Sequence, residues 1–161
     1  EESKKREGTK KVEGGNMFLT PAEFEISKGF TGNKGKLPWP VDKGVIIEKF
    51  GVHQHPIERG VKTDNKGIDI STAKDAIVKP VFEGVVSVVI TNPFGSKTIV
   101  IKHGQYLTVY TNLYALQVKK GDKVNTNTIL GKVQFDTQNS IIHFEVWKEM
   151  QVENPENWLR K

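Results

Sequence analysis

Residues 97–113 read KTIVIKHGQYLTVYTNL and are the clearest indicator of the fold class in the sequence. Two runs rich in Val, Ile, Thr and Tyr are separated by the turn-like residues HGQ. Side chains alternate along both runs, with Ile99 and Ile101 on either side of Val100, and Leu107 and Val109 on either side of Thr108. Because neighbouring side chains of a strand point to opposite faces, the pattern predicts two β-strands.

The same composition extends outward in both directions. Further predicted strands are VIIEKF (45–50), IDIS (68–71), AIVKPV (76–81), GVVSVVI (84–90), TILGKVQ (128–134) and IIHFEVW (141–147). Turn residues such as NPFGS, KKGDK and DTQNS separate them, and no helical period of useful length occurs after residue 45. The sequence therefore predicts a mostly β protein, an antiparallel sandwich or a partly closed barrel.

The region before this β-rich part has a different character. Residues 1–16 are polar, charged and without periodicity. The following LTPAEFEISKG begins like a helix, with Thr20 as N-cap, Pro21 in the first turn and Glu23 completing a capping box, and Gly29 is the expected stop. We expect residues 1–36 to be a tail with a short helix, either a linker or a lid, and residues 37–161 to be the main domain.

Composition limits the function classes. The chain has 161 residues, no Cys and a formal net charge of +5. The absence of Cys excludes thiolate metal sites and disulfides, and fits an exported bacterial protein. No apolar stretch approaches the ~18 residues of a membrane span. The positive charge forms no stripe, and the aromatic motifs of RNA-binding sheets are missing, so no nucleic-acid partner is predicted. Because the chain begins at Glu1 without a Met or signal peptide, we interpret it as a fragment or a processed form.

Two residues on separate predicted strands, Asp69 and His143, are candidate metal ligands. Hydrolytic zinc needs three protein ligands and a water, and the spare donors His53 and His55 lie on a turn-like segment where surface histidines are also common. In the last predicted strand, alternation puts His143 on the same face as Glu145. A general-base pair of these two residues lacks a nucleophile or metal to act on.

The order and spacing of longer motifs, from about Leu37 to Leu159, resemble LytM/lysostaphin-type domains. The matching runs are FGVHQHP (50–56), NKGIDIST (65–72), VKPVFEGVVSVV (78–89), TIVIKHGQYLTVYTNL (98–113), VKKGDKVNTNTILGKV (118–133) and IIHFEVWKEMQVENPENWL (141–159). The resemblance implies the fold of zinc metalloendopeptidases that cleave peptide cross-links in bacterial cell walls.

The departures from that family's pattern concern its site. Active members have His-x-Gly-x-Asp, where this chain has Asn65 and retains Asp69. They have histidines where this chain has Asn112 and Ile141, and His143 is retained. The resemblance thus implies that one metal ligand and both supporting histidines are lost. An amide oxygen is a poor zinc ligand beside imidazole, so we expect no zinc and no peptidase activity.

Among such domains, this degenerate pattern is similar to the EnvC-type murein hydrolase activators. The resemblance implies a pseudo-peptidase that binds and activates an N-acetylmuramoyl-L-alanine amidase for septal wall splitting and daughter-cell separation, in the periplasm or the bacterial cell envelope. The site of the lost metal would serve as a partner-binding groove, lined by Asn65, Asp69, Tyr110, Asn112, Ile141 and His143.

Two alternatives stay open at this point. One is a zinc endopeptidase with a non-standard ligand, in which His53 or His55 replaces the residue at 65. The other is a module that binds peptidoglycan without cutting it.

Overall fold

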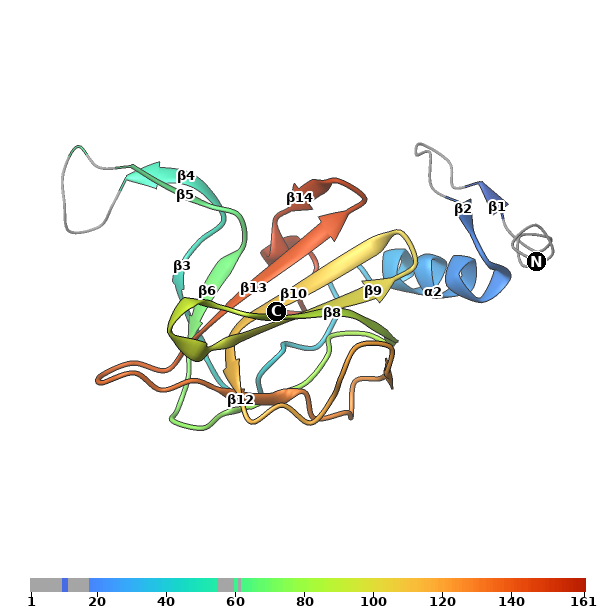
Figure 1. The fold of residues 1–161 in the computed structure, drawn as a ribbon. Coiled ribbons are helices and arrows are strands. Elements are labelled where there is room, and N and C mark those ends of the chain that lie inside the picture. Colours follow the sequence, from blue (N-terminus) through green and yellow to red (C-terminus); the bar gives the residue numbers. More distant parts are fainter. Residues whose placement is uncertain (1–9, 12–17, 55–59, 61) are drawn as a thin grey trace.

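The structure is a computed structural model that describes residues 10–11, 18–54, 60 and 62–161 (Figure 1). One α-helix, α2 (Pro21–Gly32), precedes a series of short strands. In chain order the strands are β1 (Lys10–Lys11), β2 (Phe18–Leu19), β3 (Val45–Glu48), β4 (Gly51–Gln54), β5 (Lys62–Asn65), β6 (Ile68–Ser71), β7 (Ile77–Val78), β8 (Gly84–Thr91), β9 (Lys97–His103), β10 (Tyr106–Tyr114), β11 (Lys123–Val124), β12 (Gly131–Val133), β13 (Ile141–Lys148) and β14 (Gln151–Glu153). Two 3₁₀ turns, η1 (Pro93–Gly95) and η2 (Pro155–Asn157), complete the described elements.

The main sheet is antiparallel and open. Its strands follow the order β11-β8-β9-β10-β13-β6-β3, while β12 pairs with β10 and β7, and β14 pairs with β13. The hairpins β1–β2 and β4–β5 are separate, and Figure 1 shows β4–β5 projecting beyond the sheet. The prediction of a mostly β, antiparallel fold is confirmed. Because β11 and β3 end the sheet without meeting, it does not close into a barrel.

One face of the sheet forms the hydrophobic core. Ile99, Ile101, Tyr110 and Phe144 are fully buried on adjacent strands β9, β10 and β13. In β10 the polar residue of the alternating pattern faces the core. Thr108 is buried on the core side, while Leu107 and Val109 are only half-buried on the other face.

The helix begins as the sequence predicts and ends later. Thr20 caps it, and the capping box with Glu23 is complete, with Thr20 Oγ1 accepting from the Glu23 N–H at 3.1 Å. The helix passes through Gly29, contrary to the expected stop, and continues to Gly32 because Phe30 is buried in the core, where its ring stacks on Tyr106. The helix therefore packs on the same core as the β strands, and the boundary between residues 36 and 37 stays a prediction.

Most predicted strands occur within a residue or two of their expected bounds, and β6 and β9 match fully. The run AIVKPV shortens to the two residues of β7, because Pro80 has no N–H to donate to a ladder. The sequence prediction lacks the hairpins β1–β2 and β4–β5 and the strands β11 and β14, because each of these strands has only two to four residues and shows too little alternation to be recognised.

Candidate functional site

Asp69 and His143 meet across two neighbouring strands of the sheet. The register of β6 against β13 places their Cα atoms opposite each other, on the face away from the core. The ring nitrogen Nδ1 of His143 lies 2.6 Å from Asp69 Oδ1. Thr111 on β10 is the partner of His143 on its other side. We call the surface formed by Asp69, Thr111, Ile141, His143 and Glu145 the Asp69–His143 face.

A second carboxylate completes the environment of His143. The Nε2 atom lies 2.7 Å from Glu145 Oε2, and the Trp147 indole N–H donates to Glu145 Oε1 at 2.7 Å. Burial lowers the pKa of His143, but its hydrogen bonds to Asp69 and Glu145 outweigh this and raise the pKa to about 9. Burial likewise raises the pKa of Glu145, but the bonds to His143 and Trp147 lower it overall.

These shifts define the charge state of the cluster at neutral pH. His143 is an imidazolium that donates one N–H to each of two half-buried carboxylates. An imidazolium has no lone pair for a metal, so a metal ion would have to displace a proton from His143. The sequence prediction of the site does not include Glu145, although alternation along β13 puts it on the same face as His143.

Asn65 stands at the position of the family's first metal ligand, but its side chain forms hydrogen bonds to nearby backbone groups. Its Oδ1 accepts from the Gly67 N–H at 3.2 Å, and its Nδ2 reaches the Glu48 carbonyl at 3.5 Å. Gly67 lies so close to β13 that an added Cβ would be 2.1 Å from the Phe144 carbonyl oxygen. The loop is thereby held against the site, but the polar atoms of Asn65 bond to Gly67 and Glu48 instead of to Asp69 or His143.

Asn112 and Ile141 are brought together by a bulge. The pairing of β9 with β10 shifts register between Thr111 and Leu113, and Asn112 has a left-handed φ of 82°. Asn tolerates this conformation better than most residues. Its Nδ2 donates to the Ile141 carbonyl at 2.7 Å and reaches the Gln134 carbonyl at 3.4 Å. Asn112 therefore holds the start of β13 in place.

Tyr110 does not join these residues, which corrects the sequence prediction. Its side chain is fully buried on the core face, where its ring packs against Phe144 and its hydroxyl accepts from the Val81 N–H at 3.1 Å. The reason is the bulge: residues 110 and 112 would share a face in a regular strand, and the extra residue breaks this parity. Whether the remaining residues line a groove stays a prediction.

Of the two spare histidines, the structure describes His53, which belongs to no group of described side chains that could hold a metal ion. His53 on β4 lies 3.7 Å from Glu48 Oε1 and 3.1 Å from the Gly51 carbonyl oxygen. His55 lies outside the described residues. Among the residues that are described, no three His, Cys, Asp or Glu side chains come together in a way that could hold a metal ion. The family's ligand positions hold one carboxylate, one amide and one imidazole whose two ring nitrogens are both hydrogen-bonded. This set of donors does not fit a hydrolytic zinc centre.

The open antiparallel sheet, with Asp69 and His143 paired across the neighbouring strands β6 and β13, defines a domain of the LytM peptidase type. The chain belongs to peptidase family M23, whose sequence model matches residues 63–155. In the described part of the chain, no helix has the length and apolar character that a bilayer crossing needs.

Relatives of this chain include both a sporulation protein and a peptidase. Stage II sporulation protein Q of Bacillus subtilis is 31% identical over 104 residues, which cover 60% of this chain and 37% of that protein. The structure of a SpoIIQ–SpoIIIAH pore-forming complex contains a chain with a TM-score of 0.65 and 24% identity, over 80% of this chain and 93% of that one. A zinc-containing peptidase from Vibrio cholerae has a TM-score of 0.64 and 27% identity, over 80% of this chain and 41% of that one. The chain thus spans about two fifths of the length of the sporulation protein.

Proposed function

We propose that this domain is a non-catalytic member of family M23 that binds a protein partner in the bacterial cell envelope. The proposal rests on one observation: the polar side chains at the family's site positions are hydrogen-bonded to other groups of this chain. His143 is held between Asp69 and Glu145, while Asn65 and Asn112 bond to backbone atoms. No zinc is expected to bind, and Asn112 and Ile141 stand where the resemblance implies the histidines that would support hydrolysis.

The exposed side of the sheet carries apolar side chains that a binding partner could cover. Ile141, Thr111, Val109 and Leu107 are half-buried on the exposed side of the sheet, so a partner that covered them would bury apolar surface there. That a relative forms the SpoIIQ–SpoIIIAH complex supports a protein partner for this fold. Peptidoglycan itself is the other candidate ligand.

The partner that we propose is an N-acetylmuramoyl-L-alanine amidase, which the domain would bind and activate during septal wall splitting. The degenerate site pattern at Asn65, Asn112 and Ile141 supports this choice. A second candidate is a structural partner in a two-protein envelope complex, which the similarity to stage II sporulation protein Q favours.

The test adds the purified domain to candidate amidases of the same organism and follows release of dye-labelled peptidoglycan. Stimulation of an amidase, without release by the domain alone, is the expected result. Release by the domain alone, abolished by a chelator and accompanied by stoichiometric zinc, would establish the peptidase alternative. Cosedimentation with amidase-free sacculi would establish the peptidoglycan-binding alternative.

A charge placed on the Asp69–His143 face tests where the partner binds. Ile141→Glu is expected to weaken amidase binding by about tenfold or more, because the half-buried Ile141 would become charged in the interface. Ile129→Glu, on the exposed loop before β12, is the matched control and should bind normally. Normal binding by a folded Ile141→Glu protein would exclude this face. Asn112 is less suitable, because its side chain supports the backbone of β13.

A further inference from the structure

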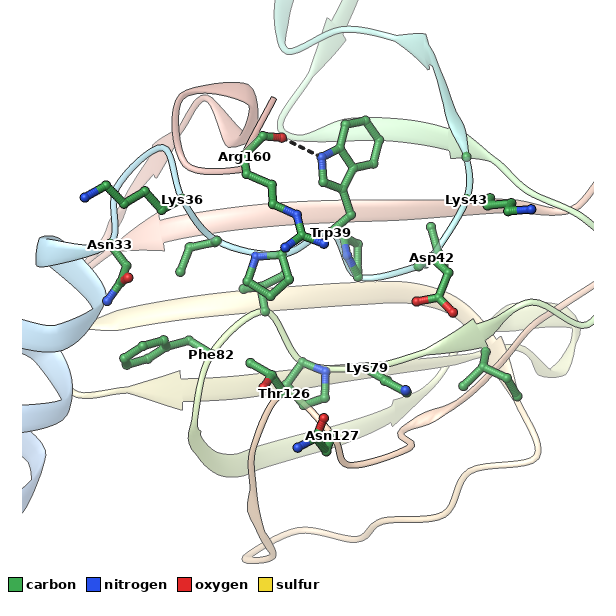
Figure 2. Close-up of a pocket in the computed structure, with 18 of the residues that line it drawn as sticks. Asn33, Lys36, Trp39, Asp42, Lys43, Lys79, Phe82, Thr126, Asn127 and Arg160 are labelled. Atoms are coloured by element: carbon green, nitrogen blue, oxygen red, sulfur yellow. Dashed lines mark hydrogen bonds between the residues drawn. The ribbon is translucent and has the colours of Figure 1, made fainter.

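A cavity of about 850 Å³ lies where four segments of the chain converge (Figure 2). Its walls come from the segment before β3, the connection from β7 to β8, the loop between β11 and β12, and the residues that follow η2. None of the residues of the Asp69–His143 face lines it. Its volume is in the range of ligand-binding sites. We call it the basic groove.

The charges of the basic groove are unbalanced. It is lined by one acidic side chain, Asp42, and by five basic ones: Lys36, Lys43, Lys79, Arg160 and Lys161. None of these basic groups forms an ion pair with an acidic side chain in the part of the chain that the structure describes. In Figure 2, Lys36 and Lys43 stand at opposite ends, with Arg160 and Lys79 between them. The positive charge is therefore spread along the length of the groove.

The groove also has a rigid apolar wall. Trp39 and Phe82 line it together with three prolines, at positions 38, 40 and 80. The Trp39 indole N–H donates to the Arg160 carbonyl at 2.8 Å, so one wall is fastened to the other (Figure 2). A backbone bond from the Lys79 N–H to the Pro40 carbonyl, at 2.9 Å, ties a third segment to them. The site is thus preformed and needs little ordering when a ligand arrives.

We infer that the basic groove binds an extended acidic segment of a partner polypeptide that carries apolar side chains between its carboxylates. An extended chain can follow the groove from Lys36 to Lys43 and meet the cations that lie between them. A purely polar anionic polymer would leave Trp39, Phe82 and the prolines without a partner. The inference is independent of the function proposed for the Asp69–His143 face, and it adds a second binding site to the domain.

The experiment measures binding of a fluorescein-labelled peptide of about ten residues, in which Glu alternates with Leu and Pro, by fluorescence anisotropy. A peptide with Gln in place of Glu is the ligand control, and polyglycerol phosphate is the purely polar polyanion. The test variant is Lys79→Glu/Arg160→Glu. The control variant, Lys120→Glu/Lys148→Glu, makes the same change of net charge at two exposed lysines outside the groove. NMR of the Trp39 indole N–H, assigned with Trp39→Phe, reports on the position of the peptide.

We expect saturable binding of the Glu peptide that weakens with added salt and shifts the Trp39 indole resonance. The Lys79→Glu/Arg160→Glu protein should bind about tenfold more weakly or worse, and the control variant within about twofold of the parent. Ile141→Glu should bind this peptide normally, which separates the inference from the proposed function. Absence of binding, or equal loss in both double variants, would overturn the inference. Polyglycerol phosphate that bound as tightly as the peptide and shifted Trp39 would assign the groove to a wall polymer instead.

Discussion

Two histidines of the same sheet have opposite environments. His103, at the end of β9, is fully buried on the core face, where its Nδ1–H donates to the Glu83 carbonyl at 2.7 Å and its Nε2 lies 2.8 Å from Thr108 Oγ1. His143, on β13, is half-buried on the opposite face between two carboxylates. Burial lowers the pKa of His103 to about 4, although the bond to Glu83 acts to raise it, whereas the pKa of His143 is about 9.

The hydrogen-bond partners, more than burial alone, set the charge of a histidine in this fold. Burial lowers the pKa of both rings. His103 has neutral partners, a carbonyl and a hydroxyl, so it stays uncharged, and Tyr110 extends the network through Thr108 at 2.9 Å. His143 has anionic partners that reverse the effect of burial. One histidine is therefore part of the core, and the other is part of an ionic cluster on the surface.

The largest expected effect comes from removing the core histidine. His103→Ala should lower the free energy of unfolding by about 3–5 kcal/mol, because it opens a cavity beside Phe30, whose ring is stacked 4.9 Å away, and leaves Glu83 and Thr108 without their partner. Urea unfolding measures the loss. His53→Ala on half-exposed β4 is the control, with an expected change below about 0.5 kcal/mol. A loss no larger than that of the control would mean that His103 is not part of a packed core.

The pH dependence of stability should have one limb for each histidine. His103 has a lowered pKa in the folded state, so its contribution is complete above the ordinary pKa of 6.5 and is lost as the pH falls towards 4. His143 has a raised pKa, so its contribution is complete below 6.5 and is lost as the pH rises through 9. Stability from this pair therefore peaks near pH 6.5. Each limb amounts to about 3 kcal/mol, the free energy that corresponds to a pKa change from 6.5 to about 4 or to about 9.

The midpoint of urea unfolding, measured from pH 4 to pH 10, should show the two limbs. Single variants then assign each limb to one histidine. His143→Gln should flatten the alkaline limb, and His103→Gln should flatten the histidine part of the acid limb. An alkaline limb that persists unchanged in His143→Gln would show that His143 is not an imidazolium at neutral pH.

A smaller loss is expected when the surface histidine is replaced at neutral pH. His143→Gln leaves the carboxylates of Asp69 and Glu145 near each other without the cation between them, and should cost about 1–2 kcal/mol. A double-mutant cycle with Asp69→Asn isolates the pairwise term. A coupling energy near zero would contradict the ion pair.

The smallest effect should come from the outer member of the cluster. Trp147→Phe keeps most of the apolar contact and removes only the indole N–H that donates to Glu145, so we expect a loss of about 0.5–1 kcal/mol. Thermal unfolding at pH 6.5 measures it. A loss as large as that of His143→Gln would mean that Trp147 supports the face mainly by packing.

Local patterns predict much of the fold. The alternation in residues 97–113 predicts β9 and β10, and the capping box predicts the start of α2, because both depend on residues that are close in sequence. The late end of α2 at Gly32 depends on Phe30 packing against Tyr106, a contact that local propensity does not contain.

The pairing of Asp69 with His143 is a long-range feature, since the two residues are 74 positions apart. Their residue types make them candidate ligands, but local pattern gives no strand register, and the resemblance to a known family is what supports placing them in one site. The face of Tyr110 was misassigned because strict alternation does not anticipate a bulge at Asn112. A hydropathy pattern also cannot predict that Thr108 is in the core, because its burial depends on hydrogen bonds to His103 and Tyr110.

The strand order has a mechanical consequence. Within the sheet, β3 is joined to the other strands through β6, and β6 through its ladder of four residue pairs with β13. A pull on β3, or on the β4–β5 hairpin that follows it, would load this ladder in shear. The His143–Asp69 ion pair crosses the same two strands within the ladder and would share that load. The ion pair would therefore add resistance to the sliding of β6 along β13 whenever a force acts on this side of the domain.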